Sequence, residues 1–223
     1  MANKKHLAVL KAGEVSWINW KSQNPEIKPD FSGANLSQFH LIKVDLSAAN
    51  FSVSNLSGAN LSQTNLSGAN FIGADLSNID LNHAIICDAN LIGTDLKNAN
   101  LRHADLGSAK LHRSNLCFAN LMAANLITAD LSRVNLYGAE LIGAYLYKTN
   151  LYQANLTQAH CGGAFLLKAN LKETDLSKAD LRWTNLSMAN LSGANLSSAN
   201  LSMANLSGAN LSGANLQGAI MPE

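Results

Sequence analysis

One apolar residue recurs at every fifth position through most of this chain, and this period constrains the fold more than any other feature. From residue 31 to residue 221 every fifth residue is leucine, except for Phe31, Phe51, Phe71, Ile86, Cys161 and Met221. The residue two places before each of these is usually alanine, and the residue directly before is usually Asn or Asp. The register never slips, so no loop interrupts the array.

A period of five fits neither regular secondary structure. Five residues of an α-helix advance by about 500°, which would spread the leucines around every side of the helix. In a continuous strand, successive leucines would alternate between the two faces. A chain that turns by about 90° after each unit instead closes a ring every four units, with all leucines directed at one axis. The spacing therefore predicts a four-sided coil with an apolar interior.

Three phenylalanines support a repeat of four units per ring. Phe31, Phe51 and Phe71 are separated by 20 residues, so they occupy the same place in successive layers. Layers paired like strands of a parallel sheet are about 4.8 Å apart. We therefore expect these three side chains to form a column in the core.

Individual units carry a recognisable pattern. Ala34-Asn35-Leu36-Ser37-Gln38 and Ala74-Asp75-Leu76-Ser77-Asn78 resemble the A-(D/N)-L-x-x unit of the pentapeptide-repeat family. The resemblance implies an all-β solenoid, a right-handed quadrilateral β-helix. We expect an N-terminal helical cap at 1–28, a repeat domain of coils of 20 residues at 29–221, and a C-terminal tail at 222–223.

The segment before the repeats has helical rather than five-residue spacing. Gly13 is a candidate break, and Asn24-Pro25 ends the helical pattern, because the residue before proline disfavours the α conformation. A solenoid needs covered ends, so we expect this segment to cap the first coil. A helix with two tryptophans could instead anchor the chain to a membrane or a partner. From Val9 to Asp30 the segment resembles N-terminal extensions of bacterial, notably cyanobacterial, family members. The expected cap residues are Leu7, Leu10, Trp17, Ile18 and Trp20.

A candidate interaction surface lies where the repeat changes composition without losing register. Tyr145 and Phe165 replace the usual Asn or Asp, and their spacing of 20 places them in adjacent layers. An exposed apolar patch on a rod is typical of a contact surface. The alternative is that the rings only improve packing between layers. The predicted surface consists of Ile127, Tyr145, Tyr147, Phe165 and Leu167.

The sequence gives no sign of catalytic chemistry. It contains no nucleophile elbow, phosphate-binding loop, dinucleotide-binding or zinc-protease motif, and a filled core leaves no substrate pocket. Cys161 is expected to be a small buried apolar residue. His83 and His103 should stack, but a metal site needs three or four ligands. We therefore expect no enzyme activity, no catalytic residues, no metal and no cofactor.

The charge of the chain limits the class of partner, and its lack of targeting signals indicates where we expect it to be located. Charged residues make up 14% of the chain and the net charge is +1, which argues against a nucleic-acid binder. No signal peptide or long apolar run is present, and the three cysteines are dispersed, so we expect a cytoplasmic protein without a membrane span.

The expected function is that of a scaffold or regulatory module that presents rows of side chains to a protein partner whose identity is unknown. The alternative is a structural spacer joined end to end, with a homodimer through the C-terminal coil as one form. The family resemblance implies regulators of cell differentiation in cyanobacteria, and also proteins that protect DNA gyrase by resembling DNA. The latter depend on a strongly negative surface, which this near-neutral chain lacks.

Overall fold

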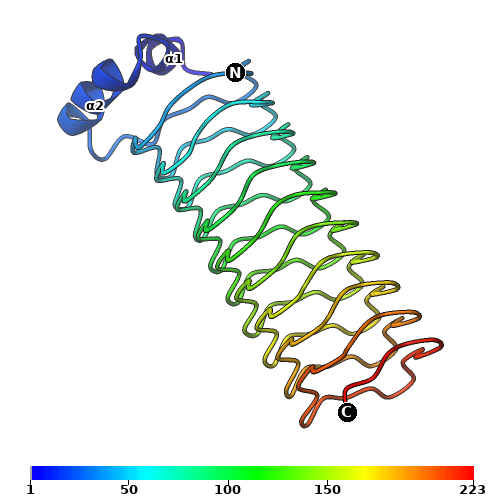
Figure 1. Cartoon of the computed structure of the whole chain (residues 1–223). Coiled ribbons are helices and arrows are strands. Elements are labelled where there is room, and N and C mark those ends of the chain that lie inside the picture. The colour runs from blue at the N-terminus through cyan, green and yellow to red at the C-terminus, as the bar shows by residue number, and fades with distance from the viewer. Residues whose placement is uncertain (1) are drawn as a thin grey trace.

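The computed structural model, which describes residues 2–223, is a straight four-sided rod with two short helices at one end (Figure 1). Parallel β-bridges join residues 20 apart along the whole array, from Asp30–Asn50 to Asn200–Ile220. Each strand consists of a single bridged residue between two turns, and α1 and α2 are the only named elements of the described chain. The predicted β-helix with four units per coil is therefore confirmed.

Each unit is tied to both neighbouring coils through its backbone. Leu36 N–H donates to the carbonyl of Asn55 at 2.7 Å, and Asn55 N–H donates to the carbonyl of Ala34 at 2.9 Å. The same pair of bonds repeats along the rod, so backbone groups that would be costly to bury unpaired are satisfied between layers. The rod has four walls, defined by their inward-facing residues: wall A (31, 51 and so on to 211), wall B (36 to 216), wall C (41 to 221) and wall D (46 to 206).

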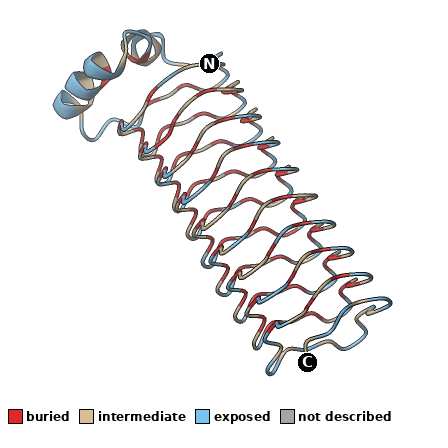
Figure 2. Ribbon diagram, viewed as in Figure 1, coloured by how far each residue is buried: buried red, intermediate tan, exposed pale blue. Residues whose placement is uncertain are grey.

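The residue at the centre of each unit and the alanine two places before it fill the interior. Buried residues recur in this way from coil to coil along the rod (Figure 2). The rings of Phe31 and Phe51 stack with centroids 5.1 Å apart, and those of Phe51 and Phe71 with centroids 5.0 Å apart. Where threonine replaces alanine, its hydroxyl is paired; Thr64, for example, donates to the carbonyl of Leu41 at 2.8 Å.

The corners are tight turns whose second residue has a positive φ, as at Val53 (+57°) and Gly68 (+64°). This left-handed conformation suits glycine or asparagine, but many other residue types adopt it here. The Asn or Asp that precedes most centres supports the corner. The Oδ1 atom of Asn35, for example, accepts a hydrogen bond from Ser37 N–H at 3.1 Å, and Asn50 donates from Nδ2 to Asp30 in the coil before it.

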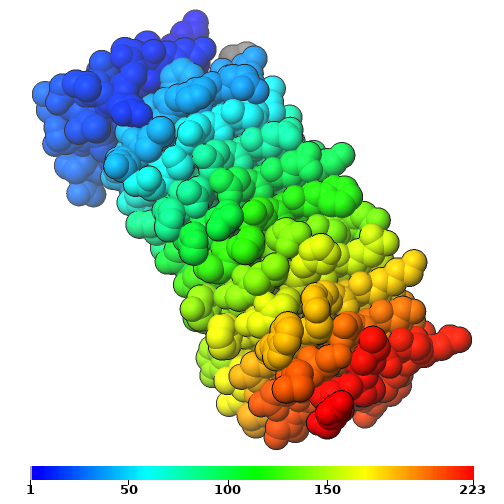
Figure 3. Space-filling view, in the orientation of Figure 1, coloured from blue at the N-terminus to red at the C-terminus, as the bar shows by residue number. Residues whose placement is uncertain are grey.

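The N-terminal segment forms α1 (Lys4–Lys11) and α2 (Glu14–Gln23), which cover the first coil (Figure 3). Asn3 caps α1 by accepting from the N–H groups of Lys5 and His6. Gly13 has a φ of 100°, which breaks the helical path between the two helices as the sequence suggests.

Candidate interaction surfaces

Wall D carries a pair of exposed aromatic rings in adjacent coils. Tyr145 and Phe165 lie in adjacent coils, bridged by their backbones, and their rings stack with centroids 5.2 Å apart and planes 5° from parallel. They are 46% and 45% exposed, so nearly half of each side chain remains accessible although the rings stack on each other.

The other three residues predicted for this surface lie at the corner between walls D and A. Ile127 is exposed, whereas Tyr147 and Leu167 are half-buried. The Lys148 ammonium lies 5.3 Å from the centre of the Tyr147 ring, a cation–π contact. The aromatic patch is the name used below for Ile127, Tyr145, Tyr147, Phe165 and Leu167.

The two rings replace a hydrogen-bonded corner. In the coil before them, Asn125 accepts from Ile127 N–H at 3.1 Å. Tyrosine and phenylalanine offer no such acceptor, and within residues 2–223 no side chain accepts from the N–H of Tyr147 or Leu167. The substitution therefore gives up local support of the turn in exchange for exposed stacked rings.

Two further exposed apolar residues lie near this patch and are not predicted from the sequence. Trp183 is 62% exposed at the corner between walls C and D, and Met188 is 58% exposed at the corner between walls D and A. Both lie at the second turn position of their unit, where the repeat has no strong preference for one residue type. They therefore do not stand out in the sequence as exceptions to the repeat. Their positions relative to Phe165 follow only from the spacing of 20. On the same wall, Ile85 is exposed three coils before Tyr145.

The helical cap is held by a buried tryptophan. Trp17 is fully buried, its ring lies 5.6 Å from that of Phe31, and its Nε1–H donates to the carbonyl of Asp45 at 2.7 Å. Leu10 is also fully buried, while Leu7 and Trp20 are partly buried against the same core. This packing leaves Trp17 unavailable to a membrane.

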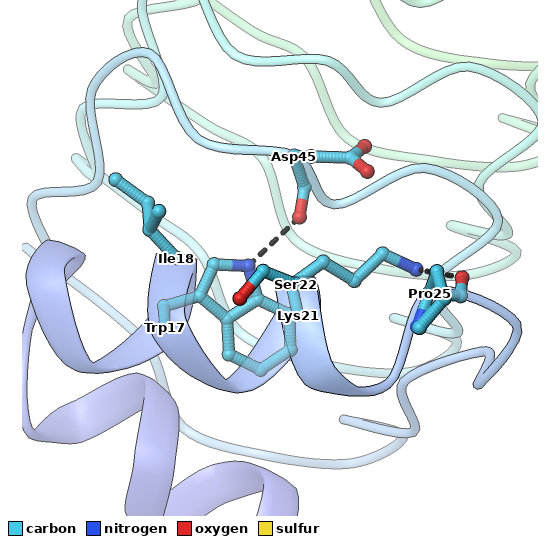
Figure 4. Close-up of a pocket in the computed structure, with 6 residues that line it drawn as sticks. All are labelled: Trp17, Ile18, Lys21, Ser22, Pro25 and Asp45. Carbon is cyan, nitrogen blue, oxygen red and sulfur yellow. Dashed lines mark hydrogen bonds between the residues drawn. The ribbon is translucent and has the colours of Figure 1, made fainter.

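Ile18 does not act as the cap residue that the sequence predicts. It is 51% exposed and lines a shallow hollow of about 300 Å³ between α2 and the first coil (Figure 4). Because consecutive helical residues are 100° apart, Ile18 cannot share the buried direction of Trp17. The Lys21 ammonium closes one side of the hollow by donating to the carbonyls of Pro25 and Ile27. The residues that line the hollow are Trp17, Ile18, Lys21, Ser22, Pro25 and Asp45.

Charged and metal-binding side chains form pairs rather than sites. His83 and His103 stack with ring centroids 4.7 Å apart, and across residues 2–223 no group of three potential metal ligands occurs. On wall C, Arg182 donates to both carboxylate oxygens of Asp180 at 2.8 and 2.6 Å. These bonds lower the pKa of the Asp180 carboxyl below its usual value.

Cys161 is buried in the core at the centre of a wall C unit. Burial raises the pKa of this thiol to about 12, with smaller contributions from Asp180 and Glu140. At neutral pH the group is therefore a thiol rather than the thiolate that a nucleophile requires. In the part of the chain that the structure describes, no helix has both the length and the apolar character needed to cross a membrane.

The repeat pattern of this chain is shared with a known protein family. The family model described as pentapeptide repeats (8 copies) matches the chain in seven overlapping or adjacent ranges, residues 30–68, 45–86, 64–102, 86–117, 119–158, 149–187 and 189–222. The chain therefore belongs to the pentapeptide-repeat family, whose members form a right-handed quadrilateral β-helix, and the handedness implied by the sequence resemblance is confirmed.

Among solved structures, the chain is similar to HetL, a pentapeptide repeat protein involved in heterocyst differentiation regulation from the cyanobacterium Nostoc sp. strain PCC 7120. The two are 33% identical over 94% of this chain and 98% of HetL, with a TM-score of 0.52. A pentapeptide repeat protein of the Arabidopsis thaliana thylakoid lumen is 38% identical over 40% of this chain and 63% of its own, with a TM-score of 0.40. No protein with curated function matches the sequence significantly.

Proposed function

We propose that this protein is a non-enzymatic regulatory or scaffold module that binds a protein partner through the aromatic patch on wall D. The observation that carries the proposal is the exposed stacked pair of Tyr145 and Phe165, placed where most other units have Asn or Asp. Exposed aromatic residues are typical of protein interfaces.

The likeness to HetL supports a regulatory role. HetL is involved in the regulation of heterocyst differentiation, and it aligns with this chain over nearly its whole length. We extend the regulatory role, but not the pathway, to this protein. In this proposal residues 29–221 form the binding rod and residues 1–28 its cap.

Non-enzymatic action in the cytoplasm, without a cofactor, is part of the same proposal. Leucine and alanine fill the interior of the coils, which leaves no room for a substrate. The cysteines are free thiols, on wall D (Cys87), wall B (Cys117) and wall C (Cys161), which suits a reducing compartment.

The test of the proposed function restores the repeat at two positions. Tyr145→Asn/Phe165→Asn removes both rings and recreates the asparagine ladder between Asn125 and Asn185. The fold should therefore be kept. Wild type and variant are cross-linked to their partners in lysate of the source organism, and the partners are identified by mass spectrometry. We expect at least one partner of the wild type to be lost from the double variant.

The matched control removes an exposed aromatic side chain from another wall. Phe118→Gln lies on wall B, in a column where Gln38 and Gln158 occupy the same turn position. It should capture the same partners as the wild type. Identical partner sets for all three proteins would contradict the proposal.

A second candidate function, assembly of copies end to end, is favoured by the exposure of the coil at residues 201–221. Leu206, Leu211 and Leu216 are only partly buried, and Met221 is 40% exposed, whereas the equivalent residues of earlier coils are buried. A homodimer through this coil would bury them. Light scattering at micromolar concentration separates the two cases: a dimer that Leu211→Lys dissociates supports assembly, and a monomer excludes it.

DNA mimicry is not favoured. The net charge is +1, and Asp75–Asp95 is an isolated acidic pair on wall B, flanked by Asn55 and Asn115 in the same column. A DNA-like rod requires a continuous negative surface. We therefore expect no effect on supercoiling by DNA gyrase.

A further inference from the structure

We propose that the occupant of the aromatic patch is a single amphipathic helix of the partner, with acidic residues along one edge. This inference rests on the proposed function and specifies the chemistry of the partner. It follows from four properties of wall D: the lack of a free strand edge at the two rings, a notch formed by glycines, the length of the apolar surface and the sign of the charge beside it.

At Tyr145 and Phe165, wall D presents no free strand edge to an extended peptide. Tyr145 N–H donates to the carbonyl of Ala124 at 2.9 Å, and the carbonyl of Tyr145 accepts from Leu126 N–H at 2.8 Å. Phe165 is bonded in the same way, donating to Ala144. Strand addition requires unpaired backbone groups at an edge. A helix satisfies its own backbone and presents only side chains, so it suits this wall.

A notch borders the two rings at the corner between walls C and D. Gly143 and Gly163 lie one above the other in the turn column that holds Ala123 before them and Trp183 after them. A Cβ atom added to either glycine would meet nothing within 4 Å. The missing side chains therefore leave space beside Tyr145 and Phe165, with the exposed Trp183 at one end. A bulky apolar side chain of the partner would fill this space.

The length of the apolar surface sets the length of the helix. From Ile127 to Met188 the surface covers three coil spacings, or about 14 Å at about 4.8 Å each. A helix rises by about 1.5 Å per residue, so about ten residues, or three turns, would cover it. Its apolar stripe would follow the i, i+3, i+4, i+7 pattern.

The charge beside the patch is positive. Lys148 and Lys168 are exposed on the corner between walls D and A, and neither forms an ion pair within residues 2–223. On wall C, Arg182 is paired with Asp180, and Glu140 is hydrogen-bonded to His160 at 2.8 Å. On the corner between walls A and B, Glu173 accepts from Gln153 at 2.8 Å. Wall D has no acidic residue from Asn125 to Met188. Complementarity therefore calls for Asp or Glu on the edge of the helix that faces the two lysines.

The first experiment measures the binding of two model helices. Both are side-chain cross-linked peptides of 14 residues with the same leucine stripe, one flanked by Glu and the other by Lys. Fluorescence anisotropy should give at least tenfold tighter binding of the Glu peptide to the wild type. Lys148→Glu/Lys168→Glu should reverse this preference. The control Lys97→Glu/Lys178→Glu makes the same charge change on wall B and should leave the preference as it is.

The second experiment fills the notch. Gly143→Gln and Gly163→Gln introduce a residue that occupies the same turn position of the same column at Gln63, where φ is 58°. Each should weaken binding of the Glu peptide at least fivefold while the circular dichroism spectrum is kept. Gly93→Gln, on wall A with equally free space, is the matched control and should bind as the wild type does.

The outcomes separate this inference from the proposed function. If Tyr145→Asn/Phe165→Asn loses a partner but the two peptides bind equally or not at all, the helix proposal is overturned and the docking surface stands. If the glycine substitutions do not affect peptide binding, the proposal that a side chain of the helix occupies the notch beside Gly143 and Gly163 is wrong. If no partner depends on the rings, the proposed function itself fails.

Discussion

At the scale of the residue, the rod repeats one kind of hydrogen-bonded turn at its corners. The corners that lack the usual Asn or Asp show how else the turn can be supported. The usual Asn or Asp accepts from the N–H two residues later, as Asp45 does from Ser47 at 3.0 Å. His40 takes this position in the first coil and cannot serve Ile42 in the same way. Glu14 of α2 accepts from Ile42 N–H instead, at 2.9 Å. The cap thus supplies a hydrogen bond that the repeat lacks at this corner.

Val53 allows the destabilisation caused by a positive φ at a corner to be measured. It is a β-branched residue at φ 57° with an exposed side chain, in a conformation that asparagine tolerates better. We expect Val53→Asn to raise the free energy of unfolding by about 0.5–1 kcal/mol. Urea denaturation measures the change. Gly93→Val, which has free space around its Cβ, should lower stability; an increase there would contradict the argument.

His6 makes the cap sensitive to pH. Its Nδ1 accepts from Asp30 N–H at 3.1 Å, which requires an unprotonated nitrogen. Burial lowers the pKa of His6 below 6.5, with smaller opposing and reinforcing effects of Asp30 and Lys5. The folded state therefore binds fewer protons than the unfolded state. The stabilisation is complete above pH 6.5 and is lost as the pH falls through the pKa of the folded state.

The His6 prediction is followed by tryptophan fluorescence, because the His6 ring lies 5.0 Å from that of Trp20. Between pH 7.5 and 5 we expect the emission to change and amide exchange in α1 to accelerate. In His6→Gln neither quantity should depend on pH over this range. A pH response of equal size in that variant would assign the effect to another group.

At the scale of the element, α2 is held mainly by one side chain. Trp17 contacts Phe31 and Trp20 and donates to Asp45, whereas its neighbour Ile18 is half exposed. We expect Trp17→Ala to destabilise the cap and first coil by about 3–5 kcal/mol. Ile18→Ala should change stability by less than about 0.5 kcal/mol.

Native-state hydrogen exchange measures the Trp17 prediction coil by coil. The loss of protection should be confined to α1, α2 and the first coils. Uniform loss along the rod would mean that the cap stabilises the whole array rather than its end. Equal effects of the two alanine substitutions would show that Trp17 is not the main contact.

Sequence reasoning predicts the repeat domain better than the cap. The coil follows from the spacing of one leucine per five residues, which only a four-sided turn can bury. The cap has no such periodicity. Leu10 and Trp17 are buried while Ile18 is not, because the break at Gly13 sets the direction of α2 and no local pattern specifies that direction. The stacking of Tyr145 on Phe165 could be anticipated from the spacing of 20, whereas Trp183 and Met188 could not, since their turn position accepts almost any residue.

At the scale of the whole molecule, each coil contacts only the coils before and after it, so stability is a sum of neighbouring terms. Deleting residues 91–110 removes one complete coil and joins Asn90 to Leu111 in the correct register. We expect a folded rod shortened by about 4.8 Å. Small-angle scattering measures the length, and circular dichroism checks the fold. A collapsed or aggregated product would contradict independence of the coils.

Because a coil has four units, the number of residues between two sites also determines the walls on which they lie. An insertion or deletion of five residues would keep every leucine buried but move each downstream residue to the adjoining wall. Tyr145 and Phe165 would then lie about 90° further around the rod axis relative to α2. The contacts within the aromatic patch and within the cap would not change. Evolution can therefore re-aim an interaction surface on this scaffold by indels alone, in steps of five residues, without redesigning the surface itself.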